Sequence, residues 1–427
     1  MFKILANAWK VEDIRKKLLY IMLMLLIFRI GQFISLPGID AMLISNMSRT
    51  NETLFSLITG GGFASVFHLG IGPYITSSII MQLLTVAIPK LEQLKKDGEE
   101  GQKKINQITR IMAVGLATLQ ASFTVLNYTR YPMGHDASGN IVIQNLFPVG
   151  NAHILTYIMA TAAMVTGTIF VMWMAELLTE KGIGNGSSFI IFANILSSLP
   201  MGVQALTDKF TDGIAGIAIA IMVIVLFAVL VGFVVLVQAG ERRIPVQYSK
   251  KLVGRGMLGN FIPIKVNIAG VMSIIFAVSL LGFPRQIYQF WQNELLGTIA
   301  NYLELTHVVG VCLYVVLIFM FTFFYTSFAI NPIEMAENLK KNGGFVPGIR
   351  PGKPTSEYIQ KTVDRLSWIG AIFYSLIAIA PILFTKISGM NMGFGGTTLL
   401  IVTGVAIEFI KQLESQLLMR HYKGFLN

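Results

Sequence analysis

Long apolar blocks recur along the whole chain and are separated by shorter polar segments. The blocks are about 18–25 residues long, the length that a helix needs to cross a hydrocarbon core about 30 Å thick. The pattern therefore predicts ten membrane-spanning helices. They are expected at residues 18–36, 73–89, 109–127, 153–175, 187–200, 214–237, 266–283, 307–330, 367–385 and 396–411.

The second and fifth predicted spans are short or interrupted by glycine. An apolar stretch at 54–71 precedes the second span, and Gly60, Gly61 and Gly62 break it. It is too short to be a further span. Non-helical backbone at membrane depth is tolerated only where protein or a water-filled cavity satisfies its polar groups. We therefore expect a re-entrant half-helix folded into the protein interior.

Composition and charge support the membrane assignment and set an orientation. The chain is 54% hydrophobic and 13% charged, whereas soluble domains carry roughly 25% charged residues. With a cytoplasmic N-terminus, 27 of the 33 Lys and Arg residues fall in cytoplasmic segments and five in external loops, and Arg29 lies within the first span. The positive-inside rule then predicts that both termini are cytoplasmic.

The predicted fold class is an all-α integral membrane protein with ten transmembrane helices in two inverted five-helix halves and a re-entrant half-helix. An odd number of spans per half places related halves upside down relative to each other, as in inverted-repeat transport folds. The predicted parts are a cytoplasmic amphipathic segment 1–17, an N-terminal half 18–200, a C-terminal half 201–411 with large cytoplasmic loops 238–265 and 331–366, and a cytoplasmic tail 412–427.

The sequence predicts no catalytic residue, metal site or cofactor. It contains no HExxH, GxSxG or P-loop motif and no Cys/His cluster with metal-ligand spacing. The GxG within residues 182–186 lacks the rest of a dinucleotide fingerprint and is better explained as a turn into the fifth span. His68 is expected to be a packed or hydrated residue. A secondary transporter, the alternative function, requires several buried ionisable residues that the spans do not offer, and an intramembrane enzyme requires a nucleophile–base pair or metal ligands at depth.

Three features leave alternatives open. Arg29 either holds a gate or plug by donating to backbone carbonyls or fixes the packing between helices. Ile71, Ile75 and Ile79 form one stripe of a helix, which is usual in ordinary packing but also fits a hydrophobic constriction. The Pro and Gly residues of FVPGIRPGKP exclude a helix at 345–354. This basic loop is predicted to dock a cytosolic partner, although ribosomal RNA or anionic lipid are also possible ligands.

Several segments of the chain resemble the SecY family of protein-translocation channels. They occur in the family's order, from the first span to the last. They are IFRIGQFISLPGID, LGIGPYITSSIIMQLLTVAIPKLEQLKKDGEEGQKKINQITR, LLTEKGIGNGSSFIIFANI, AGERRIPVQY, IPIKVNIAGVM, FFYTSFAINPIEMAENLKKNGGFVPGIRPG and FGGTTLLIV.

The resemblance implies an hourglass channel of two five-helix halves that open like a clamshell, and it assigns roles by family position. The pore ring would be Ile71, Ile75, Ser187, Ile191, Ile275 and Ile401, and Ser187 departs from the branched apolar residue usual there. The plug would span roughly 56–69, with Leu57, Gly60, Gly61, Gly62, Phe63 and Phe67. The lateral gate would lie between spans two and three on one side and spans seven and eight on the other. Its polar positions would be Thr76, Gln82 and Gln120. Arg242, Arg243 and Arg350 would bind SecA or the ribosome, and Arg29 would be a structural intramembrane charge.

The function implied is a protein-conducting channel of the bacterial plasma membrane that passes unfolded polypeptides and releases apolar segments sideways into lipid. The implied partners are SecE-like and SecG-like membrane subunits, the SecA motor ATPase, the ribosome, signal sequences, unfolded preproteins and membrane lipid. Since the chain carries no nucleotide site, a partner would supply the energy.

Overall fold

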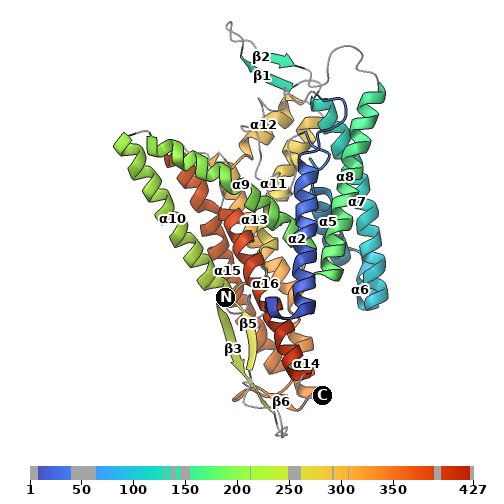
Figure 1. The fold of residues 1–427 in the computed structure, drawn as a ribbon. Coiled ribbons are helices and arrows are strands. Elements are labelled where there is room, and N and C mark those ends of the chain that lie inside the picture. Colours follow the sequence, from blue (N-terminus) through green and yellow to red (C-terminus); the bar gives the residue numbers. More distant parts are fainter. Residues whose placement is uncertain are drawn as a thin grey trace. The chain divides into compact units, whose positions relative to one another are not determined.

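The computed structural model describes residues 8–39, 64–128, 131–135, 141–144, 154–211, 213–248, 261–290, 293–305, 307–388 and 396–423. Within these ranges the chain is mostly helical and has three small two-stranded sheets (Figure 1). The chain divides into two compact units. The first comprises Met1–Pro200, Gln286–Gln292 and Val405–Asn427, and the second comprises Met201–Arg285 and Asn293–Gly404.

The body of the first unit is a helical bundle. Its long helices are α2 (Glu12–Gln32), α5 (Gly72–Ala87), α7 (Glu99–Tyr128) and α8 (Ile154–Lys181). Helix α5 packs against α7, α7 against α8, and α2 against α8. One face of α7 is buried along its length by residues spaced four apart, namely Thr109, Ala113, Ala117, Ala121 and Val125. Small side chains at such a face let neighbouring helices approach closely. A hairpin of β1 (Tyr131–His135) and β2 (Ile141–Gln144) follows α7.

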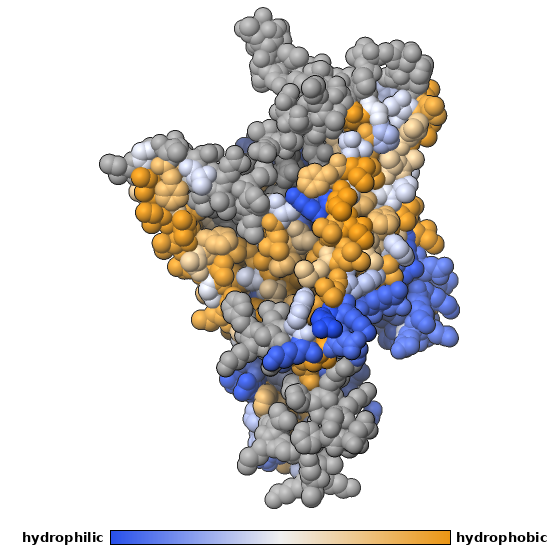
Figure 2. Space-filling model, viewed as in Figure 1, coloured by the Kyte–Doolittle hydropathy of each residue, from blue (hydrophilic) through white to orange (hydrophobic). Residues whose placement is uncertain are grey.

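A sharp bend ends the second predicted span. Helix α6 (Pro89–Lys96) leaves α5 at an angle of 101°. Proline disfavours helical backbone in the residue before it, and Ile88 is extended. No residue of α6 is buried. Lys96 donates to Glu92 at 2.6 Å, and this hydrogen bond holds the pKa of the Glu92 carboxyl below its usual value. Exposed lysines of α6 and early α7 make this end of the first unit hydrophilic (Figure 2).

The turn between α8 and α9 (Gly186–Thr211) depends on three glycines. A side chain at Gly182 would overlap the Leu178 carbonyl, and one at Gly186 would overlap the Ala175 carbonyl. Gly184 has φ +94°, a left-handed conformation that favours glycine. The Gly186 N–H donates to the Thr179 hydroxyl at 2.8 Å and closes the turn. The turn predicted at residues 182–186 is therefore present.

The second unit contains the remaining helices and both larger polar loops. Its elements are α10 (Gly213–Ala239), α11 (Met272–Phe290, whose last residues belong to the first unit), α12 (Glu294–Tyr302), α13 (Val308–Ala329), α14 (Pro332–Lys341), α15 (Lys353–Ser388) and the beginning of α16 (Gly396–Lys423). Helix α13 packs against α15, where Trp368 lies edge-on to Phe319 and Phe323, with ring centroids 5.7 and 5.2 Å apart.

The two polar loops of the second unit fold together into what we term the loop domain. Strand β3 (Glu241–Pro245) pairs with β5 (Phe261–Lys265), and β4 (Gln247–Tyr248) pairs with β6 (Gly344–Phe345) from the other loop. Their apolar side chains share one core with α14 and the start of α15. That core comprises Ile244, Val246, Ile264, Leu339, Val346, Ile359, Val363 and Leu366.

The predicted all-α membrane class is confirmed, and each of the ten predicted spans overlaps a described helix. The count of ten membrane-spanning helices stays a prediction. Five of the described helices are long and apolar enough to cross a membrane, namely those in α7, α8, α10, α13 and α15, and the bent pair α5–α6 would add a sixth. Helices α9 and α11 contain shorter apolar stretches, Gly186–Ser197 and Met272–Arg285. Charged residues lower the hydropathy of α2 and α16.

Several boundaries differ from the predicted ones. Helix α9 continues to Thr211, beyond the predicted end at 200. Helix α11 begins at Met272 rather than 266, because Gly270 before it has φ +62°. Helix α15 begins at Lys353, well before 367, and thereby includes the last two residues of FVPGIRPGKP. Its added turns carry Ile359, Val363 and Leu366 into the loop-domain core. Proline is tolerated in the first turn of a helix, so Pro354 does not prevent this start.

Candidate functional site

The predicted pore-ring residues of the first unit lie at the beginnings of two helices. Ile71 immediately precedes α5 and is fully buried, and Ile75 stands in the first turn and is also buried. Ser187 and Ile191 occupy the first two turns of α9. Ile191 is buried, whereas Ser187 is half-buried, and its N–H donates to the Asn185 side chain at 3.0 Å. Three of these four positions thus present buried branched apolar side chains.

The second unit repeats this placement at two helices. Ile275 lies in the first turn of α11 and Ile401 in the second turn of α16, and both are buried. All six predicted ring positions therefore lie within the first six residues of a helix or immediately before it.

The chain that leads into α5 is docked inside the first unit. The Ala64 carbonyl accepts from the Leu36 N–H at 3.0 Å, and the Val66 N–H donates to the Ile34 carbonyl at 2.9 Å. Ser35 and Ser65 form an isolated antiparallel bridge between these bonds. Residues 64–71 then form successive turns before α5 begins. Backbone groups of segment 64–70 are thus bonded within the protein, as non-helical chain at membrane depth requires. Residues 54–63 of the predicted half-helix lie outside the described residues.

Two glycines make room for this segment. A Cβ at Gly167 of α8 would overlap the carbonyl of Val66, and a Cβ at Gly31 of α2 would overlap the ring of Phe67. The Phe67 ring stacks between Phe28 and Phe170, with centroids 6.0 and 5.9 Å away. Phe67 is the one predicted plug residue within the described ranges. Leu57, Gly60, Gly61, Gly62 and Phe63 lie outside the described residues.

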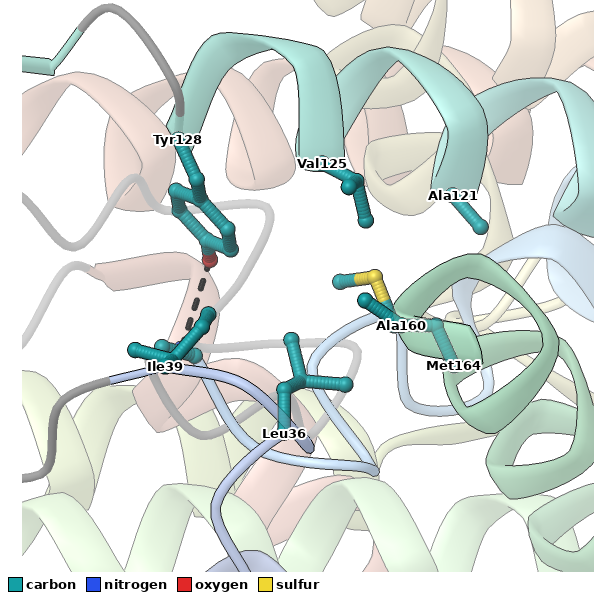
Figure 3. Close-up of a cluster of buried hydrophobic side chains, with 8 residues drawn as sticks. Leu36, Ile39, Ala121, Val125, Tyr128, Ala160 and Met164 are labelled. Atoms are coloured by element: carbon teal, nitrogen blue, oxygen red, sulfur yellow. Dashed lines mark hydrogen bonds between the residues drawn. The ribbon is translucent and has the colours of Figure 1, made fainter. Parts of the chain in front are cut away.

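A buried cluster closes the other side of segment 64–70 (Figure 3). It contains Leu36, Ile39, Ala64, Ala121, Val125, Tyr128, Ala160 and Met164. The Ala64 N–H donates to the Tyr128 hydroxyl at 3.3 Å, shown dashed in Figure 3. The same hydroxyl lies 3.3 Å from Nδ1 of His68. We call the surface that holds segment 64–70 the seat. It consists of Gly31 of α2, Gly167 of α8, and the cluster residues after α2 and on α7 and α8, with Tyr128 at its edge.

The predicted lateral-gate residues of the first unit lie on one pair of packed helices. Thr76 is buried on α5, Gln82 is half-buried on α5, and Gln120 is half-buried on α7. Helices α5 and α7 pack against each other. Tyr128 lies on the same helix as Gln120, two turns further along, so α7 connects the predicted gate positions to the seat.

Arg29 lies in the last turn of α2, where its charge is favourable for the carbonyl end of the helix. It donates to Gln32 at 2.6 Å and lies 5.0 Å above the Phe33 ring. Gln32 in turn donates to Asn194 of α9 at 3.0 Å. These contacts link α2 to α9, as the helix-packing explanation expects. Residues 54–63, to which Arg29 would bond in the plug explanation, lie outside the described residues.

The predicted partner-binding arginines belong to the loop domain. Val346 is buried in its core, and the Ile349 N–H donates to the Val346 carbonyl at 3.0 Å across Pro347 and Gly348. Gly348 has φ +81°, so this is the turn that Pro followed by Gly favours. The turn leaves Arg350 exposed. The predicted absence of helix thus holds from 345 to 352.

Arg242 and Arg243 are both exposed but differ in their surroundings. Arg243 pairs with Glu241 at 2.7 Å and lies 4.8 Å over the ring of Phe261 on the neighbouring strand. Its side chain therefore braces the β3–β5 hairpin. Arg242 occupies the adjacent position of β3, on the opposite face of the strand.

Sequence reasoning missed most of the seat. Tyr128, Gly31 and Gly167 come from three helices distant in the sequence, and no local spacing relates them to residues 64–70. The expectation that His68 is packed or hydrated did not identify its contact with Tyr128. The clearest available signal was glycine inside apolar helices, which often marks a close approach of another chain segment. Among the residues that the structure describes, no group of His, Cys, Asp or Glu is arranged to hold a metal ion.

The helices and their order are those of a protein-conducting channel. A solved structure described as "The structure of a protein conducting channel" superimposes with a TM-score of 0.67 at 18% identity, over 93% of this chain and 91% of that chain. A second, whose title concerns the plug domain of the SecY protein, has a TM-score of 0.63 at 17% identity and covers 93% and 91% of the two chains. At this identity the likeness establishes the fold.

Sequence relatives establish the family. Residues 65–410 match the family model SecY. The chain is 41% identical to the protein translocase subunit SecY of Streptomyces coelicolor and 41% identical to that of Bacillus subtilis, over 100% of this chain and of each relative. The chain belongs to the SecY family, and it is a multi-pass membrane protein with this family's channel fold.

Proposed function

We propose that this chain is the pore subunit of a protein-conducting channel that passes unfolded polypeptides across the bacterial plasma membrane. The observation that carries the proposal is the docked segment 64–70, whose backbone is bonded within the first unit and which leads directly into Ile71 and Ile75. A re-entrant segment beside apolar constriction residues suits a pore that is blocked at rest. The relatives are translocase subunits, which agrees with a channel rather than an enzyme.

The proposed constriction is a ring of Ile71, Ile75, Ser187, Ile191, Ile275 and Ile401. A translocating polypeptide has no fixed charge or shape, so a binding site specific for one sequence would not serve it. Pliable branched side chains can close around many different chains without bonding to them, and an apolar constriction excludes ions by dewetting. Ser187 makes one position of the ring more polar than its neighbours.

Lateral release is proposed along α5 and α7, which carry Thr76, Gln82 and Gln120. The opposite side of the gate would come from the seventh and eighth spans, α11 and α13. An apolar segment of about 20 residues gains free energy on entering lipid, which favours its sideways exit. In this scheme 18–200 and 201–411 act as the two halves, with both termini cytoplasmic.

The loop domain is the proposed docking surface for a cytosolic partner. Arg350 is exposed at a rigid turn, with Arg242 and Arg243 on β3 of the same domain. The SecA motor is one proposed partner. The ribosome is another, because a solved structure of similar fold shows a yeast Ssh1 complex bound to the 80S ribosome, with a TM-score of 0.59. SecE-like and SecG-like subunits complete the proposed assembly.

Reconstitution tests this function. The purified chain with SecE-like and SecG-like subunits is placed in vesicles and supplied with SecA, ATP and an unfolded preprotein. We expect protease-protected preprotein inside the vesicles that depends on ATP and on a signal sequence. Failure to import the preprotein, together with robust uptake of a small solute, would instead favour the secondary-transporter alternative.

A further inference from the structure

The Tyr128 hydroxyl joins two elements that are far apart in the sequence. Tyr128 is the last residue of α7, and its hydroxyl accepts from the Ala64 N–H at 3.3 Å. The His68 ring lies edge-on to the Tyr128 ring, and its Nδ1 is also 3.3 Å from the hydroxyl. One side chain of α7 therefore contacts two residues of the segment that precedes α5, Ala64 and His68. Figure 3 shows the bond of Tyr128 to Ala64 as a dashed line.

Ala64 is held by hydrogen bonds at both its N–H and its carbonyl. It is fully buried and has φ +52°, a left-handed conformation that is uncommon for a residue other than glycine. Such a conformation persists only where the surroundings determine it. Here the N–H is bonded to Tyr128 of α7 and the carbonyl to the Leu36 N–H of the chain that follows α2.

We propose that Tyr128 is a positioning residue that couples α7 to segment 64–70. This inference rests on the proposed channel function, in which α7 carries the gate residue Gln120 and segment 64–70 leads into Ile71 and Ile75. Gln120 lies eight residues before Tyr128, or about 12 Å along a helix. When α7 shifts as the gate opens, the bond to Ala64 must move with it or break. A signal sequence that displaces α7 would thereby release the segment before the constriction.

Removal of the hydroxyl alone is the first test. Tyr128→Phe keeps the ring but leaves the Ala64 N–H buried without its partner. We expect the resting ion leak of reconstituted vesicles to rise about tenfold, since a lost buried hydrogen bond shifts an equilibrium by about that factor. Import of a preprotein with a defective signal sequence should rise as well. Tyr20→Phe on α2 is the matched control, because Tyr20 is half-buried in the same unit and lies away from the seat.

A second variant, on α8, disturbs the seat without changing Tyr128. Gly167→Ala places a Cβ against the Val66 carbonyl, whereas Gly115→Ala on α7 adds a Cβ that meets no atom within 4 Å. We expect the leak and the relaxed signal requirement for the first variant and not for the second. If the Tyr128→Phe protein does not accumulate in the membrane, the ion leak and signal requirement of Gly167→Ala decide whether the coupling holds.

Signal selection separates coupling from a merely structural role. Variants that lose thermal stability but keep the wild-type leak and signal requirement would overturn the coupling, and so would variants indistinguishable from wild type. Both outcomes leave the proposed function standing, provided that the wild-type chain imports preprotein. If the wild-type chain imports none under any condition, the proposed function fails first and the coupling fails with it.

Discussion

The seat and the loop domain both hold irregular chain against helices, but different forces hold them. Segment 64–70 is fixed by backbone hydrogen bonds, by the Phe67 stack, and by glycines that let the chain approach α2 and α8 closely. The loop domain is fixed by a shared apolar core and two small sheets. The stability of the seat should therefore fall when a substitution adds side-chain atoms. The stability of the loop domain should fall when a substitution removes them from its core. The loop domain also presents charged side chains on its surface, whereas the seat encloses segment 64–70.

The largest effect is expected from a charge reversal on the surface of the loop domain, which leaves its core intact. Arg350→Glu should abolish SecA-driven transport and leave the channel folded and inserted, because the side chain is exposed and Thr355 bonds only the Arg350 carbonyl. Import of preprotein into vesicles measures this, and Arg365→Glu, an exposed charge reversal on α15, is the control. Normal import by the Arg350 variant would remove this residue from the docking surface.

Polar substitution of the ring compares the two units. Changing Ile71, Ile75 and Ile191 in the first unit, or Ile275 and Ile401 in the second, to Asn should raise ion leak and relax signal-sequence selection. The physical reason is that polar side chains keep a narrow constriction wet. Single-channel conductance measures the leak. Unchanged conductance after several such substitutions would show that these residues are ordinary helix packing.

Removing atoms from the loop-domain core should unfold that domain selectively. Ile359 is fully buried, and Ile359→Ala should cost about 3 kcal/mol through lost burial and the cavity left behind. Limited proteolysis should then cut within 238–265 and 331–366, while the membrane helices stay protected. Ile333→Ala on α14 is the control, because Ile333 is 64% exposed. Equal protease sensitivity of the two variants would contradict a core-held domain.

Adding atoms should be the damaging change at the seat. Gly31→Ala puts a methyl group into the space of the Phe67 ring, which cannot move aside because it is stacked between two other rings. Overpacking of this kind should cost about 2 kcal/mol, visible as a lower midpoint of thermal unfolding. Gly232→Ala on α10, where a Cβ meets nothing within 4 Å, is the control. If the Gly31 variant is as stable as this control, the seat accommodates the added methyl group and the prediction is wrong.

The smallest effect is expected on α6, which packs neither into the seat nor into the loop-domain core and buries no residue. The hydrogen bond from Lys96 lowers the pKa of Glu92 in the folded chain. A lowered folded pKa means that the pair stabilises the helix above the unfolded pKa, and that this contribution is lost as the pH falls through the folded pKa. The carboxyl chemical shift of Glu92 should titrate below its usual range and return to it in Lys96→Gln. Because the pair is exposed, salt should weaken the effect.

Sequence patterns predicted the helices well and their surroundings poorly. Each predicted apolar block overlaps a described helix, since about 20 apolar residues in succession have few alternatives in a membrane protein. The glycine turn before α9 and the absence of helix from 345 to 352 were also predicted, because both depend on adjacent residues. The early start of α15 was missed, because Ile359, Val363 and Leu366 are ordered by a loop that lies about 100 residues earlier in the sequence.

By itself the sequence determined the membrane class, the approximate positions of the helices and a family resemblance that the comparisons confirm, and its charge asymmetry predicts an orientation. These properties follow from composition, local periodicity and contiguous motifs. Only the tertiary structure decided that two distant loops share one core, that Arg243 lies over the Phe261 ring of another strand, and that Tyr128 bonds Ala64. Each of these is a contact between residues far apart in the chain, which local periodicity does not encode.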